Sequence, residues 1–79
     1  MRSDDVLLVI KLNVPERELL YQVAKGLLDR GHASFPPRRR LYNLGLIEIS
    51  GPVVADVLPL WRITDDGKRW LALEKKNGR

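Results

Sequence analysis

The sequence predicts an α+β fold in which helices are followed by a two- or three-stranded β-hairpin and a C-terminal helix. Residues 14–28 carry apolar side chains at helical spacing. Residues 46–49 and 60–64 alternate between apolar and polar side chains on either side of a connection rich in Gly and Pro, as paired strands do. Residues 64–76 contain a helix-capping sequence followed by strong helix formers.

The chain has 79 residues, which predicts one domain over residues 1–79 with a frayed tail at 77–79. A chain this short buries only about 60–65% of its surface on folding, so a deep catalytic cleft is hard to build. It contains no Cys, which excludes disulfides, thiolate metal sites and a cysteine nucleophile. It also has only one His, His32. We therefore expect no enzyme activity, no metal and no cofactor.

The formal charge is +4, and all of this excess lies in residues 36–79. A basic half is compatible with a nucleic-acid partner, although soluble proteins often carry such a bias. The longest apolar run, residues 6–10, is far too short to cross a bilayer, and the acidic pair before it does not suit a signal peptide. We expect a soluble, cytoplasmic protein without membrane contact.

Residues 3–12 leave two structures open. Ser3, Asp4 and Asp5 resemble a helix N-cap with acidic residues in the first turn, where carboxylates favour the positive end of the helix dipole. The residues that follow are apolar on all sides and rich in β-branched types, which equally suits a buried strand. A short helix within residues 4–12 is the favoured interpretation.

A second helix is predicted to begin at residues 13–16, because proline is tolerated in a first turn and Glu16 favours the N-terminal dipole. Gly31 is a candidate stop. One face of this helix should be apolar, with Leu19, Leu20, Val23, Ala24, Leu27 and Leu28, and the other polar, with Glu16, Arg17, Gln22, Lys25 and Asp29.

A third helix is predicted over residues 36–44, from Pro36-Pro37 to the stop at Gly45. At about 100° per residue, a helix that buries Leu41 and Leu44 also turns Pro37 inward. Its two flanks then carry Arg38 and Arg40, and its exposed face carries Arg39, Tyr42 and Asn43. The connection before it, residues 31–35, leaves little room for a second helix, so two structures stay open: a shortened turn, or a single tight helical turn over Arg30 to Phe35.

The strands that follow should bury Ile47 and Ile49 on the first and Trp61 and Ile63 on the second, and should pair Glu48 with Arg62. Residues 64–67 have two interpretations: a hydroxyl N-cap followed by acids starts a helix, whereas Asp-Gly is a strong hairpin turn. Residues 68–76 favour the helix, because they do not alternate and place lysines at the C-terminal end. Trp61 and Trp70 are expected core anchors.

The segments 41–48 (LYNLGLIE) and 61–68 (WRITDDGK) resemble the recognition-helix exit and the wing-to-last-helix junction of winged helix-turn-helix domains in small bacterial and phage regulators. The resemblance covers about residues 13–73. It implies a recognition helix at residues 36–44 and a wing between the two strands. The short connection at residues 31–35 departs from the family pattern, because most members have another helix there.

The resemblance and the helical geometry together indicate a DNA-contacting surface. Arg39 and Asn43 are four residues apart, and their side chains match guanine and adenine edges in a major groove, so both are candidate base contacts. Phosphate contacts are expected from Arg38, Arg40 and Tyr42. The simpler interpretation is that three consecutive arginines form a solvated surface. Lys68 and Arg69 would contribute contacts if their helix lies beside residues 36–44.

The predicted wing tip, residues 51–59, lacks the cations that many winged domains place there and carries one acid, Asp56. Exposed apolar residues at this tip would suit a partner protein or a second copy, and we assign this role to Val53, Val54, Val57 and Leu58. The alternative is that these residues fold back as an extra strand over the core.

Two functions follow as hypotheses. The first is a DNA-binding transcriptional regulator, acting as a dimer because one short helix reads only a few base pairs. The second is a small adaptor or inhibitor that binds a host or transcription-machinery protein through the apolar wing, since winged domains also serve as protein-binding modules.

Overall fold

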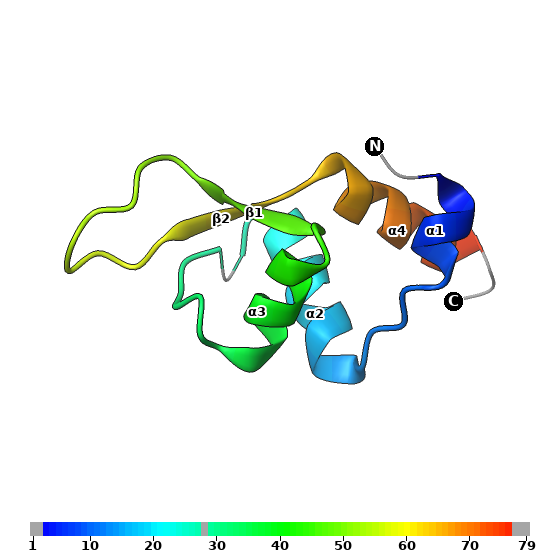
Figure 1. Ribbon diagram of the computed structural model, residues 1–79, viewed down its shortest axis with the longest axis horizontal. Helices are drawn as coiled ribbons and strands as arrows, with labels where there is room; N and C mark the ends of the chain where they lie inside the picture. The colour runs from blue at the N-terminus through cyan, green and yellow to red at the C-terminus, as the bar shows by residue number, and fades with distance from the viewer. Residues whose placement is uncertain (1–2, 28, 77–79) are drawn as a thin grey trace.

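The computed structural model describes residues 3–27 and 29–76. Its elements are α1 (Asp4–Leu8), α2 (Val14–Ala24), α3 (Pro36–Asn43), β1 (Ile47–Ser50), β2 (Leu60–Ile63) and α4 (Asp65–Lys76), arranged as Figure 1 shows. The α+β class and the order of elements are as predicted. The expectations for Leu28 and for the tail at residues 77–79 lie outside the described residues.

The first apolar segment is helical, but only over Asp4–Leu8. The Ser3 side chain makes no capping hydrogen bond, and Leu7 is the one residue of α1 that is fully buried. The helix ends before Ile10, whose carbonyl oxygen accepts a hydrogen bond from the Trp70 indole N–H at 3.0 Å. The favoured interpretation of residues 4–12, a short helix, is therefore confirmed, but the helix ends at Leu8 although apolar residues continue to Leu12.

Helix α2 begins with a capping box: the Glu16 backbone N–H donates to the Asn13 side chain at 2.9 Å, and the Asn13 N–H donates to the Glu16 carboxylate at 3.0 Å. Its predicted stop at Gly31 is wrong. The helix ends at Ala24, and Gly26, with φ +76°, turns the chain away. Leu19, Leu20 and Val23 are buried as predicted, whereas Ala24 and Leu27 are exposed.

Residues 29–31, between α2 and α3, pair with the hairpin. Arg30 forms an isolated antiparallel bridge with Leu60, and the Gly31 N–H donates to the Pro59 carbonyl at 3.2 Å. A turn at residues 33–35 then leads into α3, with the Phe35 N–H donating to the His32 carbonyl at 3.3 Å. As the short connection predicted, the described residues between α2 and α3 contain no further helix.

Strands β1 and β2 pair antiparallel, with Ile47 opposite Ile63 and Glu48 opposite Arg62. The predicted cross-strand ion pair is confirmed, since Arg62 Nε lies 2.8 Å from Glu48 Oε2. Ile47 and Trp61 face the core. On the other side of β2, the isolated bridge between Arg30 and Leu60 places one further extended residue beside the two-stranded sheet.

Thr64 resolves the two interpretations of residues 64–67 in favour of the helix. Its hydroxyl accepts a hydrogen bond from the Gly67 N–H at 3.0 Å, which caps α4, and donates to the Gly45 carbonyl at 2.6 Å. Gly45, with φ +77°, lies directly after α3. Because the Thr64 hydroxyl is bonded to both Gly45 and Gly67, it joins the end of α3 to the start of α4.

The core contains side chains from every element, and both tryptophans are buried in it as predicted. Its buried members are Leu7, Leu19, Leu20, Val23, Leu41, Leu46, Ile47, Trp61, Trp70 and Leu73. The molecule measures 41 × 23 × 19 Å, with the loop between the strands at one end of the long axis and α1 at the other (Figure 1). Of the helices described, none has the length and apolar character required to span a membrane.

Candidate nucleic-acid interface

Helix α3 presents an exposed ridge formed by Arg39 and Asn43. Leu41 is fully buried and Leu44 is packed against the core, which turns Arg39 and Asn43 to the solvent as predicted. Within the described part of the chain, neither side chain makes a hydrogen bond or an ion pair. Their polar groups are therefore available to an external partner.

Arg38 is not on this surface, contrary to its predicted place on an exposed flank. The residue is only 7% exposed. Its guanidinium lies 5.1 Å from the centre of the Phe35 ring, and Nη1 donates to the His32 carbonyl at 3.1 Å. The space for it exists because residue 31 is glycine, since a Cβ on Gly31 would overlap the guanidinium. Burial lowers the pKa of Arg38, and its Nε is buried without a hydrogen-bond partner in the described structure.

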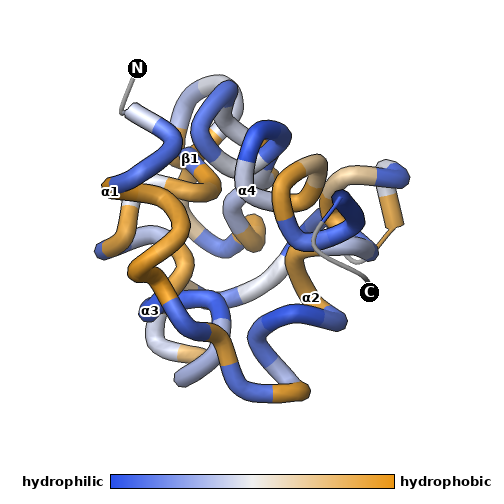
Figure 2. Tube along the Cα trace, turned by 90° about the vertical axis from the view of Figure 1, so that its right-hand side faces the viewer, coloured by the Kyte–Doolittle hydropathy of each residue, from blue (hydrophilic) through white to orange (hydrophobic). Residues whose placement is uncertain are grey.

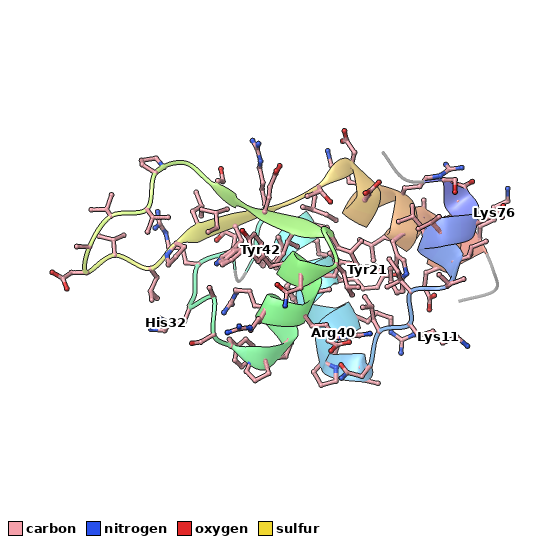
Figure 3. All side chains as sticks on the ribbon, viewed as in Figure 1. Lys11, Tyr21, His32, Arg40, Tyr42 and Lys76 are labelled. Atoms are coloured by element: carbon pink, nitrogen blue, oxygen red, sulfur yellow. The ribbon has the colours of Figure 1, made fainter. Side chains whose placement is uncertain are left out.

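Arg40 lies on the flank of α3, where it holds the helix in place. Its guanidinium pairs with the Glu16 carboxylate and donates to the Lys11 carbonyl at 2.9 Å. Glu16, predicted on the polar face of α2, is buried because it takes part in both the capping box and this ion pair. The side chain of Arg40 remains 45% exposed, so it also borders the ridge (Figure 3).

Tyr42 lies where α3 meets the hairpin (Figure 3). Its ring packs edge-on against Trp61, with ring centres 5.4 Å apart and an interplanar angle of 76°. The Trp61 indole N–H in turn donates to the Gly31 carbonyl at 2.9 Å. Tyr42 is nevertheless 47% exposed, so the residue that fixes the helix against the sheet also contributes to the outer surface.

Lys68 and Arg69 are apart from the α3 ridge, so the condition for their predicted role is not met. Helix α4 packs on α1, α2 and β2, and Figure 1 shows it beside α1. Arg69 donates two hydrogen bonds to the Asp4 carboxylate, at 2.8 and 2.7 Å. These hydrogen bonds are the main reason that the pKa of Asp4 is lowered and that of Arg69 is raised. Arg69 therefore ties α4 to α1.

The loop between β1 and β2, residues 51–59, extends away from the helices (Figure 1). It does not form an extra strand over the core. Val53, Val54, Val57 and Leu58 are each at least 42% exposed, and Asp56 adopts a positive φ of 64° at the tip. The predicted apolar surface at this end is therefore present, and we call these four residues the loop patch.

Two features of the site were missed by sequence reasoning. The first is Lys11, an exposed residue before α2 whose carbonyl accepts a hydrogen bond from the end of the Arg40 side chain (Figure 3). The second is the burial of Glu16. The spacing of Asn13 and Glu16 is that of a capping box, and this pattern could have indicated that Glu16 is held against the protein.

The described side chains of His, Asp and Glu do not gather in any group of three that could hold a metal ion. No family model matches this chain, and no curated protein or solved structure matches it either.

Proposed function

We propose that the protein is a DNA-binding winged-helix protein, a transcriptional regulator that places α3 in the major groove. The observation that carries this proposal is the α3 ridge, on which Arg39 and Asn43 are exposed and unpartnered within the described structure. Helix α3 directly precedes the β1–β2 hairpin, and α4 follows it, which is the order of the resembled family.

The chemistry of the ridge suits base recognition. An arginine guanidinium donates two hydrogen bonds to guanine O6 and N7, and an asparagine amide pairs with adenine N6 and N7. Side chains four residues apart on a helix are neighbours, separated by about 6 Å along its axis. Arg39 and Asn43 can therefore address adjacent base pairs.

The phosphate contacts of this proposal differ from those expected from the sequence. Arg38 is removed from the surface by burial, and Lys68 and Arg69 lie apart from α3. The exposed part of Arg40, exposed Tyr42 on the same helix, and Lys11, which is bonded to Arg40 through its carbonyl, take the phosphate-contacting role in this proposal. Such contacts set the position of the helix on DNA, whereas base contacts set its sequence preference.

Replacing Arg39 with alanine is expected to lower affinity for a preferred duplex by about 5- to 150-fold, the equivalent of about 1–3 kcal/mol, and to relax base preference. The preferred duplex is first selected from a random pool. Affinities are then measured by fluorescence titration at about 50 and about 200 mM salt, because phosphate contacts make binding salt-dependent.

The matched control is Arg62→Ala, which removes the same charge from the hairpin, where Arg62 is paired with Glu48. This variant should keep the base preference of the parent protein. If the parent binds no duplex at either salt concentration, or if Arg39→Ala and Arg62→Ala behave alike, the proposal is wrong.

The exposed loop patch favours a second candidate function, a small adaptor or inhibitor that binds a host or transcription-machinery protein. The loop contains four exposed large apolar residues and no cation, which suits a protein partner better than phosphate. For this function, Val54→Asp should abolish binding to the purified partner and leave DNA affinity unchanged, as measured by calorimetric titration. A partner that binds the variant as tightly as the parent would exclude it.

A further inference from the structure

A second exposed apolar surface lies at the opposite end of the molecule from the loop patch. Val6, Leu8 and Val9 are 47%, 47% and 73% exposed, and we call them the α1 patch. The view onto this end in Figure 2 shows hydrophobic residues running along α1. The two patches are separated along the 41 Å long axis (Figure 1).

The α1 patch is not required for the core of a single copy. Leu7 alone fills the contact between α1 and the interior, and the ion pair of Asp4 with Arg69 holds the helix on α4. Adjoining exposed apolar side chains in a small protein usually mark a binding surface. The α1 patch therefore calls for an occupant.

The two patches differ in shape. Arg30, Pro52, Val54, Val57 and Leu58 are among the residues that line a hollow on one side of the loop, whereas α1 is a convex turn of helix. Two hollows facing each other leave space between them, whereas a convex helix can fill a hollow. A convex α1 patch seated in a loop hollow brings apolar surface together from both sides.

The charges of the two surfaces are also complementary. Arg30 is exposed at the base of the loop, where its one side-chain hydrogen bond to a described residue is a long one, 3.4 Å to the Leu58 carbonyl. Asp5 lies on the outer side of α1, one helical turn before Val9, and makes no ion pair within the described residues. An α1 patch in the hollow can thus bring a carboxylate to a guanidinium.

We propose that the α1 patch of one copy docks on the loop patch of the next, so that copies associate head to tail. Such a contact uses two different surfaces and leaves one of each free, so it continues as an open row unless the rotation closes a ring. The partner of the loop patch is thus a second copy of this chain.

Head-to-tail contact has a consequence on DNA, which rests on the proposed function. With some overlap at each junction, copies 41 Å long repeat at a distance near one turn of DNA, about 34–36 Å. Where the rotation from one copy to the next is also small, successive α3 ridges meet the same side of the duplex. A ridge with two base-contacting side chains would in this way read a long site through several copies.

The test uses purified protein without DNA, so that its outcome is independent of DNA binding. The weight-average mass is measured by sedimentation against concentration for the parent, for Val54→Asp and for Val9→Asp. The parent mass should rise beyond twice the monomer mass of 9.1 kDa, and each variant alone should stay monomeric. Both changes are at exposed positions, and circular dichroism confirms folding.

The decisive sample is an equimolar mixture of the two variants. One intact loop patch can meet one intact α1 patch, so the mixture should reach twice the monomer mass and no more. Val14→Asp, an exposed valine outside both patches, is the matched control and should associate as the parent does. A parent that stays monomeric, a single variant that still associates, or a mixture that stays monomeric would each overturn the proposal, and the last two would indicate another occupant.

Discussion

Replacing Gly67 with alanine is expected to destabilise the protein by about 2–3 kcal/mol. A Cβ at this position would overlap the backbone carbonyl oxygen of Leu46 and would lie 2.6 Å from Ile63 Cγ1. A backbone carbonyl between α3 and β1 cannot move aside without shifting the hairpin. The gain from replacing glycine in a helix is at most about 1 kcal/mol and does not offset this overlap.

Urea denaturation of the two proteins measures the loss in the free energy of unfolding. Lys68→Ala is the control, because Lys68 is the next residue of α4 and is exposed, so its removal should change stability by less than about 0.5 kcal/mol. A Gly67→Ala protein as stable as the parent would show that α4 does not approach Leu46 as closely as described.

Replacing Arg40 with methionine should destabilise the fold by about 2 kcal/mol. Removing one partner of a fully buried ion pair costs about 3–5 kcal/mol, because the other charge is left buried and unpaired. The Glu16 side chain is 6% exposed, but that of Arg40 is 45% exposed, and solvent therefore reduces the effect. Methionine keeps most of the apolar stem of the side chain, so the loss in the free energy of unfolding measures the contribution of the charge and its hydrogen bonds.

A double-mutant cycle with Glu16→Gln isolates the pair. The loss in the double variant should be smaller than the sum of the two single losses by about 1 kcal/mol or more, as measured by urea denaturation. Arg62→Met provides the comparison, since its pair with Glu48 is 64% and 45% exposed and is expected to contribute about 0–1 kcal/mol. Additive losses for Arg40 and Glu16 would mean that Arg40 does not hold α3 on α2.

The elements that were predicted correctly are those set by local signals. Prolines at the start of α3, Gly45 at its end and Thr64 before α4 act within a few residues of themselves, so their effect can be inferred without knowing the fold. The ridge of Arg39 and Asn43 followed from the same kind of argument, because burial of Leu41 fixes the helix rotation.

The features that were missed have different causes, and one of them depends on residues distant in the sequence. The extended pairing of Arg30 needs Leu60, which approaches only when the hairpin forms. The pattern of α2 continues past Ala24 as far as Leu27, but Gly26, with φ +76°, turns the chain before Gly31 is reached. Arg38 is buried because a glycine at residue 31 and the ring of Phe35 form its pocket, and helical periodicity contains no information about either.

The attachment of α1 to α4 affects how the chain is made. The hydrogen bond from Trp70 to Ile10 joins residues 60 apart, and that from Arg69 to Asp4 joins residues 65 apart. During translation the first helix leaves the ribosome long before the surface that receives it. Attachment of α1 must therefore wait for α4, and closing so long a loop slows folding relative to a helical protein with local contacts.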